Sequence, residues 1–217
     1  MNSEKSWLIK KIFWWQRILL LLFTINCSLF TFSQVGTWKH YLAYHEVQDI
    51  HKAGDNLFVL ASNGLYQYNL NDQSITTYDR TNGLSDTHII HIGWSQQAKR
   101  LIAVYENSNI DLIDTNGNVI NIAALYNKST TEDKTVTDVR IDGIYAWLVT
   151  GFAIIKVNLQ KAEITDTYTK GHPEYPSSLP EKNTADYDQY ISMVNTLKPI
   201  GPDYNHFYEA KFLNNQL

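Results

Sequence analysis

The residues best suited to chemistry in this chain are histidines and carboxylates. His88 and His91 stand three apart in the stretch HIIH. Imidazole nitrogen is a common metal ligand, but residues three apart on a strand point to opposite faces of the sheet, so these two cannot share a metal ion. His40, His45 and His51 are neighbours in sequence only. We therefore predict packed or solvated histidines and no metal site.

Three aspartates form the second candidate group. Asp49, Asp86 and Asp138 occupy similar places, before or within the first strand of three successive sequence repeats. A ring of carboxylates near a common axis could bind cations or act as acid and base. An aspartate in such a place more often accepts a hydrogen bond from a turn or loop amide, and we favour that structural role. We predict no catalytic residue and no cofactor.

A third group resembles known motifs only in part. The stretch DTNGN, Asp114 to Asn118, has the oxygen-rich composition of a calcium loop, but its glycine is misplaced and the closing Glu is absent. We predict a hairpin turn there. The sequence holds no GxSxG, no Ser-His-Asp signature and no phosphate-binding loop. The abundant Tyr and Trp residues could stack on sugars, but they fall mainly in repeat columns, which favours core packing.

A repeat of 44 to 45 residues must position these side chains. The stretch at 65–79, LYQYNLNDQSITTYD, is echoed at 110–124 and at 154–168. The shared apolar columns are Leu65, Ile110 and Ile154; Tyr68, Ile113 and Val157; and Ile75, Ile120 and Ile164. Each repeat contains four short segments rich in β-branched and aromatic residues, separated by turn-forming residues such as those at 62–64 and 71–73.

Four antiparallel strands at a fixed period of this length are typical of a β-propeller blade. We therefore predict an all-β fold, a partial β-propeller with three four-stranded blades at about 47–79, 87–123 and 136–168. A β-sandwich is the alternative, but it does not predict a fixed period. Because a closed propeller usually has four to eight blades, we expect the chain to be the N-terminal piece of a longer protein. We also expect the open ring to leave apolar blade faces uncovered, which promotes association.

The pattern changes on both sides of the three repeats. All five prolines lie between Pro173 and Pro202, and we predict a loop and one helix over 170–200, the helix near 185–197. Its apolar residues recur at helical spacing: Tyr187, Tyr190, Ile191, Val194 and Leu197. Residues 203–217 are predicted to start a further blade, and 38–41 to be an outer strand that completes a last blade.

The N-terminus has the order of a secretory signal peptide. Four basic residues precede an apolar run at about 18–32, and small residues follow. The run is about 15 residues, short of the ~20 needed to span a bilayer. We predict cleavage between Ser33 and Gln34, which leaves a mature chain with no transmembrane segment in the periplasm or at the cell surface. Cys27 does not indicate a lipoprotein, because bulky Asn26 stands where a small residue is required.

The predicted mature chain, residues 34–217, is long enough for one domain with a real core. It contains no cysteine, so it has neither disulfides nor a thiolate metal site. It carries 14 Lys and Arg against 21 Asp and Glu, a net charge of −7. This acidic balance, without a basic cluster, argues against nucleic acid as a partner.

Several phrases resemble the start of the PorZ family, surface proteins of the type IX secretion system in Bacteroidota. The likeness runs continuously from Trp38 to Tyr168, through NGLSD, AKRLIAVYENSNIDLID, YNKSTTEDKTV and AWLVTGFAIIKVN, and returns in GPDYNHFYEAKFLNNQL at 201–217. NGLSD and NIDLI are moderately specific, because propellers of hybrid two-component sensors use similar phrases. The whole N-terminal match is stronger than any one phrase.

The resemblance implies two propellers followed by a small β-sandwich that serves as a sorting signal. It also implies a role in an attachment complex with a PorU-like sortase and outer-membrane secretion components, and in presenting anionic lipopolysaccharide. This sequence lacks a second propeller and a terminal sandwich, and Gly171–Ile200 lacks the pattern of a fourth blade. The resemblance implies no catalytic residue.

Three functions stay open at this point. The first is a non-enzymatic scaffold or ligand-presenting component of the secretion machinery. The second is the periplasmic sensor propeller of a hybrid two-component regulator. The third is a propeller enzyme that acts on glycans. Sequence beyond Leu217 would separate them, because a second propeller favours the first and a membrane helix with a kinase favours the second.

Overall fold

The computed structural model describes residues 7, 14–17, 44, 46–62 and 64–196. The chain divides into two units, Met1–Lys39 and His40–Leu217, and in the first unit residues 7 and 14–17 are helical. The predicted cleavage after Ser33, the outer strand at 38–41 and the blade start at 203–217 lie outside the described residues, so they remain predictions. Within the described part of the chain, no helix has the length and apolar character to cross a membrane.

The second unit contains three four-stranded antiparallel sheets, each formed by four consecutive strands in sequence order. Blade 1 comprises β1 (Val47–Ala53), β2 (Asn56–Ala61), β3 (Gly64–Asn69) and β4 (Ile75–Tyr78). Blade 2 comprises β5 (Ile89–Ser95), β6 (Arg100–Tyr105), β7 (Ile110–Asp114) and β8 (Val119–Asn121). Blade 3 comprises β9 (Val136–Asp142), β10 (Tyr145–Thr150), β11 (Ala153–Asn158) and β12 (Glu163–Thr169). The predicted all-β partial propeller is confirmed.

The hairpin turns form where turn residues tolerate a left-handed backbone. Ser62, between β2 and β3, has a φ of 46°, and Gln73, between β3 and β4, has a φ of 62°. The Asn69 side-chain oxygen accepts the backbone N–H groups of Asn71 (2.8 Å) and Asp72 (3.2 Å). An Asn side chain that imitates a backbone turn in this way fixes the hairpin, and with it the register of the outer strand.

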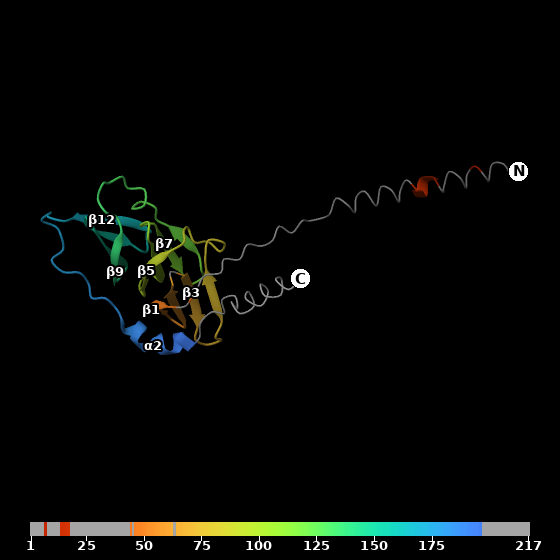
Figure 1. Cartoon of the computed structure of the whole chain (residues 1–217), viewed down its shortest axis with the longest axis horizontal. Coiled ribbons are helices and arrows are strands. Elements are labelled where there is room, and N and C mark those ends of the chain that lie inside the picture. Colours follow the sequence, from red (N-terminus) through yellow and green to blue (C-terminus); the bar gives the residue numbers. More distant parts are fainter. Residues whose placement is uncertain (1–6, 8–13, 18–43, 45, 63, 197–217) are drawn as a thin grey trace, which may run out of the picture. The chain divides into compact units, whose positions relative to one another are not determined.

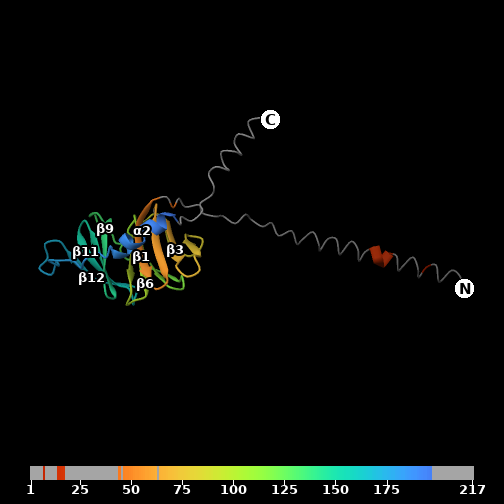
Figure 2. The same ribbon diagram turned by 90° about the horizontal axis from the view of Figure 1, so that it is seen from below.

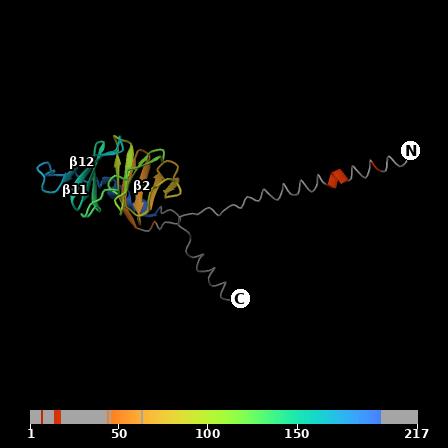
Figure 3. The same ribbon diagram turned by 90° about the horizontal axis from the view of Figure 1, so that it is seen from above.

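The first strand of each blade is the innermost, and the three inner strands β1, β5 and β9 lie side by side (Figure 1). Figure 3 shows β11 and β12 of blade 3 at the end of the arrangement away from blade 1. The outer strands β4, β8 and β12 lie at the rim. Two of the three sequence columns are therefore buried, whereas Ile75 and Ile120 of the third are 39% and 40% exposed.

Adjacent blades pack face to face through apolar side chains. We call the face of a blade that looks toward the next blade in sequence its forward face, and the opposite one its backward face. Phe58 and Leu60 on the forward face of blade 1 pack against Trp94 and Leu101 of blade 2. Ile102, Val104 and Leu112 on the forward face of blade 2 pack against residues of blade 3 that include Val139 and Leu148. Both faces of blade 2 are dry, which explains its apolar strands.

The helix α2 (Ala185–Thr196) packs on the backward face of blade 1 (Figures 1 and 2). Its Val194 is 1% exposed and belongs to a cluster with Leu57, Val59 and Tyr66, which are all buried. The helix therefore stands where a preceding blade would pack in a closed ring. The expectation that the open ring leaves apolar blade faces uncovered does not hold for the backward face of blade 1, because residues far along the chain cover that face.

Candidate functional site

A β-bulge near the start of each inner strand places one polar residue at the same point of all three blades. The register shifts between Val47 and Asp49 in β1, between Ile89 and His91 in β5, and across the equivalent step of β9. Asp49 pairs with Leu60, His91 with Val104 and Asp138 with Val149. Leu60, Val104 and Val149 occupy the same position in the second strands of their blades. Their partners Asp49, His91 and Asp138 therefore occupy the same position in the inner strands. We call these three the inner-strand row.

The two aspartates of the row use one oxygen to satisfy the backbone. Asp49 Oδ1 accepts the N–H of Ile50 at 2.9 Å, and Asp138 Oδ1 accepts the N–H of Val139 at 3.0 Å. A bulge interrupts the ladder of backbone hydrogen bonds, and an unpaired buried amide is costly. Each aspartate therefore accepts a backbone amide, as the sequence suggested, but the amide belongs to its own inner strand and not to a turn or loop.

The sequence placed Asp86 in this row, and the structure does not. Asp86 lies before β5, where its Oδ1 accepts the N–H of Thr87 at 2.8 Å and its Oδ2 accepts the side-chain amide of Asn107. His88, between Asp86 and the strand, has a φ of 68°, so regular β geometry begins only at Ile89. His91 therefore takes the position that the sequence assigned to Asp86.

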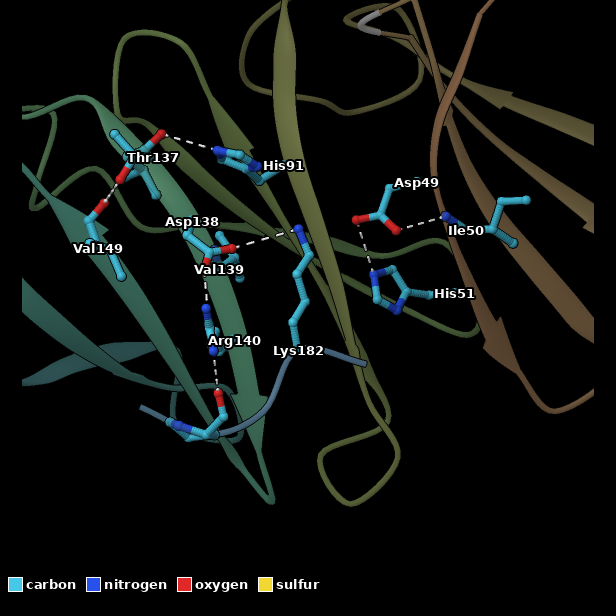
Figure 4. Close-up of polar contacts among 12 residues, drawn as sticks. Asp49, Ile50, His51, His91, Thr137, Asp138, Val139, Arg140, Val149 and Lys182 are labelled. Carbon is cyan, nitrogen blue, oxygen red and sulfur yellow. Dashed lines mark hydrogen bonds and ion pairs between the residues drawn. The ribbon is translucent and has the colours of Figure 1, made fainter. Parts of the chain in front are cut away.

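Two cationic side chains approach the Asp138 end of the row (Figure 4). Arg140 Nε donates to Asp138 Oδ2 at 2.8 Å, and Lys182 Nζ lies 3.6 Å from Asp138 Oδ1. Arg140 also donates through Nη1 to the carbonyl of Pro180 at 2.9 Å. Residues 180–182 belong to the segment that runs from blade 3 to α2, so these contacts fasten that segment to the inner strand of blade 3.

The Asp49 end of the row is occupied by a histidine on the same strand. His51 is 7% exposed, and its Nε2 lies 3.5 Å from Asp49 Oδ2 without forming a hydrogen bond (Figure 4). Both carboxylates of the row therefore have a nitrogen-bearing side chain beside them. The contact of Asp138 with Arg140 is a hydrogen bond of 2.8 Å, whereas Asp49 Oδ2 has only the longer contact with His51.

His91, in the middle of the row, is held as a neutral donor. Its Nε2 lies 3.1 Å from the carbonyl oxygen of Val136, which can only accept, so Nε2 carries the proton. Burial is the largest influence on the pKa of His91 and lowers it, and the positive charge of Lys182 lowers it further. The hydrogen bond to the Val136 carbonyl and the charges of Asp138 and Asp49 raise it. The net result is a pKa below the ordinary value for histidine. A neutral imidazole that already donates to a carbonyl is a structural cross-link between blades 2 and 3.

The row has two carboxylates, two cationic neighbours and a neutral imidazole, so its formal charges balance. It contains no hydroxyl or thiol nucleophile activated by a base. Among the described residues, no group of three or more His, Cys, Asp or Glu is arranged to hold a metal ion. Chemically, the arrangement can tie the inner strands and the segment at 180–182 together.

The remaining sequence candidates lie apart from the row. Asp114 Oδ1 accepts the N–H groups of Asn116 (2.8 Å) and Asn118 (3.0 Å), and Gly117 has a φ of 83°, so DTNGN forms the β7–β8 turn. His88 is exposed in the loop before β5. His40 and His45 lie outside the described residues.

Sequence reasoning missed the most deeply buried carboxylate among the described residues. Asp111 in β7 is 0% exposed and accepts the hydroxyl of Tyr105 (2.6 Å), the N–H and the hydroxyl of Ser85 (2.7 Å each) and the amide of Asn121 (2.8 Å). It anchors the connection between blades 1 and 2 to the middle of blade 2. Burial, together with the hydrogen bond and charge of Asp111, raises the pKa of Tyr105. A sequence signal for this buried carboxylate was present: in the aligned repeats Asp111 stands at the position of Tyr66 and Ile155, where a polar residue interrupts an otherwise apolar column.

The N-terminal β-propeller domain of PorZ, a component of the type IX secretion system, is the family whose model matches, over residues 57–194. The solved structure of PorZ from Porphyromonas gingivalis, described as an essential bacterial surface component of that system, is 34% identical with a TM-score of 0.59. The match covers 63% of this chain and 18% of that PorZ, so this chain spans about a fifth of its length.

More distant similarities are to structures of other proteins. The extracellular domain of a protein assigned as a hybrid two-component system of B. thetaiotaomicron is 23% identical over 58% of this chain and 17% of its own, with a TM-score of 0.48. No curated protein matches the sequence. The family match covers well over half of the chain, and it includes all three blades from β2 onward and most of α2. The chain belongs to the PorZ N-terminal β-propeller family.

Proposed function

We propose that this chain is a non-enzymatic, cell-surface component of a type IX secretion system, with a scaffolding or ligand-presenting role like that of PorZ. The observation that carries the proposal is the family match over residues 57–194, supported by 34% identity to a PorZ that is itself a surface component of that system. Because the chain spans 18% of that protein, the role of the whole PorZ is extended here to a part of it.

The polar side chains of the blades support a structural role. Asp49 and Asp138 each give one oxygen to the backbone, and Asp111 is saturated by four donors from three residues. Catalytic acids and bases need a reacting atom within hydrogen-bond reach and a proton to exchange. These groups instead hold strands, loops and blades together, which suits a rigid support.

The partners that we propose follow from the family. They are a PorU-like sortase, outer-membrane secretion components and anionic lipopolysaccharide. The predicted mature chain has a net charge of −7, so an anionic polysaccharide would need a local cationic site on it. Asp138 already engages Lys182 and Arg140.

The test is deletion of the gene in its native host, followed by complementation. We expect type IX cargo to lose its attachment to the cell surface, and the sortase-like peptidase to co-purify with the tagged product from wild-type cells. Cells that lack the gene and still attach cargo normally would contradict the proposal. A membrane helix and kinase encoded downstream of residue 217 would instead indicate the sensor.

Location is tested separately. Secretion through the predicted signal peptide places the chain outside the inner membrane, at the periplasm or cell surface. Mass spectrometry of the native protein should find Gln34 as its first residue. A native protein that begins at Met1 would show that the N-terminal segment is retained.

A further inference from the structure

Two Asn-Gly pairs lie wholly within the described residues, Asn82–Gly83 in the connection before β5 and Asn116–Gly117 in the turn between β7 and β8. Both asparagines are exposed. The side-chain carbonyl of an asparagine that precedes glycine is open to attack by the next backbone nitrogen, because glycine has no side chain to block the approach and its backbone turns freely. The attack closes a cyclic succinimide. In a folded chain it depends on how the asparagine side chain is held.

The Asn82 side chain is held at both of its polar atoms. Its Oδ1 accepts the N–H of Asp79 at 2.6 Å, and its Nδ2 donates to the carbonyl of Thr77. Attack on the side-chain carbonyl carbon requires the carboxamide to rotate and therefore to lose both hydrogen bonds. The fold thus protects this Asn-Gly pair.

The Asn116 side chain has no such restraint. Within the described part of the chain, neither polar atom of its carboxamide takes part in a hydrogen bond, although its backbone N–H donates to Asp114 Oδ1 at 2.8 Å. The N–H of Gly117 donates to the carbonyl of Asp114 at 3.1 Å, so one backbone hydrogen bond must open before this nitrogen attacks. The carboxamide of Asn116 itself is free to rotate toward it.

The β3–β4 turn of blade 1 has the same position with a different residue after it. Asn71 aligns with Asn116 in the repeat and is also exposed. It donates its N–H to Asn69 Oδ1 at 2.8 Å, as Asn116 does to Asp114. Asp72 follows Asn71, and its side chain obstructs the approach of the backbone nitrogen. Of these three asparagines, Asn116 therefore combines a free carboxamide with a glycine after it.

We propose that Asn116 is a site of spontaneous covalent modification, at which the chain deamidates through a succinimide. The nitrogen of Gly117 forms a bond to Asn116 Cγ, and the bond from Cγ to Nδ2 breaks. The proton of the Gly117 amide leaves with Nδ2, so ammonia is released. A water molecule then opens the ring at either of its two carbonyl carbons, which leaves an aspartate or an isoaspartate. The proposal does not rest on the proposed function.

The modification acts on the outer strand of blade 2. Asp114 holds the turn together, since its Oδ1 accepts the N–H of Asn118 at 3.0 Å and its Oδ2 accepts the Asn118 side-chain amide at 2.8 Å. An isoaspartate lengthens the backbone before Gly117 and adds a negative charge close to Asp114, and both effects oppose these contacts. The start of β8 therefore loosens. Its end stays anchored, because Asn121 Nδ2 donates to the buried Asp111 at 2.8 Å.

The test is peptide mapping by mass spectrometry of the full chain during incubation at mildly alkaline pH, with Asn71 and Asn82 as internal references. Asn82 must lose two hydrogen bonds before attack and Asn116 one, and a net hydrogen bond changes an equilibrium constant about fivefold. We therefore expect Asn116 to deamidate about fivefold faster than Asn82, and Asn71 to be slower than Asn116. Both aspartate and isoaspartate should form at residue 116. The matched control Asn116→Gln should remove these products, because the longer side chain closes a ring much less readily, and should leave the rate at Asn82 unchanged.

Incubation in urea separates the effect of the fold from that of the sequence. Both Asn-Gly pairs should deamidate at similar rates in the unfolded chain, because the hydrogen bonds of Asn82 are then absent. A native rate at Asn116 less than about twofold above that at Asn82, a lag of Asn82 that persists in urea, or aspartate without isoaspartate would overturn the proposal. In the modified native protein, the amides of 118–120 should exchange hydrogen faster while those of β6 do not, and unchanged exchange at 118–120 would refute the effect on β8.

Discussion

Replacement of Val194 by Ala should loosen α2 from blade 1 without unfolding the blades. Val194 is the one fully buried residue among the described residues of α2, whereas Tyr187, Tyr190 and Met193 are only partly buried. A twelve-residue helix is marginal in water by itself, so its attachment depends on the surface that it buries.

The magnitude follows from the buried side chain. Val194 is 1% exposed, and its change to Ala removes the equivalent of two methylene groups at about 0.8 kcal/mol each. The cavity left beside Leu57 and Val59 adds to that loss, which gives about 2 kcal/mol in total. Since 1.36 kcal/mol is a factor of ten, the population with α2 detached should rise by roughly 30-fold.

Hydrogen exchange measured by mass spectrometry can test this locally. Amides of α2 should exchange roughly 30-fold faster in the variant, while those of β6 and β10, which do not contact the helix, should keep their rates. Gln189→Ala is the matched control, because Gln189 is exposed on the same helix and its replacement should leave the rates unchanged. Detachment also bares Leu57 and Tyr66, so the variant should self-associate at high concentration.

The result that would refute the reasoning is equally local. If Val194→Ala left α2 exchange unchanged, the helix would not be held by the apolar face of blade 1. If all three blades loosened together, α2 would belong to one cooperative unit with them, and it would not be a separate cover.

Three further outcomes are expected. Burial lowers the pKa of His91 in the folded chain, so the unfolded chain takes up a proton first as the pH falls below about 6.5, and the folded state should lose stability in that window. The urea midpoint of His91→Asn should decline less over the same pH range than that of the unchanged protein. An equal decline would contradict this. Asp111→Ala leaves the Tyr105 hydroxyl and other buried donors unpaired, so it should reduce the free energy of unfolding by about 3 kcal/mol and the melting temperature by roughly 6–12 °C. Asp111→Asn should be milder. A calorimetric change in melting temperature below a third of this would refute the anchoring role of Asp111. Lys182→Met should change stability by less than ~1 kcal/mol and lose its effect in high salt, because the Lys182 side chain is 46% exposed beside Asp138; a larger, salt-independent loss would point to packing instead of charge.

The strands, their turns and the helix could be predicted from the sequence because local rules determine them. Alternating apolar residues, Asn- and Gly-rich turns and the period of 44 to 45 residues fixed three four-stranded blades, and the spacing from Tyr187 to Val194 fixed α2. Each of these signals acts between residues close in sequence. The repetition of one pattern also required that blades pack on one another, because neither face of a single apolar blade can be wet.

The tertiary structure alone decided which side chains meet. The inner-strand row differs from the predicted one because Asp86 lies before β5, on the other side of the left-handed backbone of His88, so that His91 takes the position equivalent to Asp138. The covering of blade 1 by α2 joins residues that are more than 130 positions apart. Contacts of this kind have no local signature, since they depend on the path of the connecting chain and on which apolar face is left without a partner. The sequence therefore determined the blades, whereas long-range packing determined the inner-strand row and the face of blade 1 on which the helix packs.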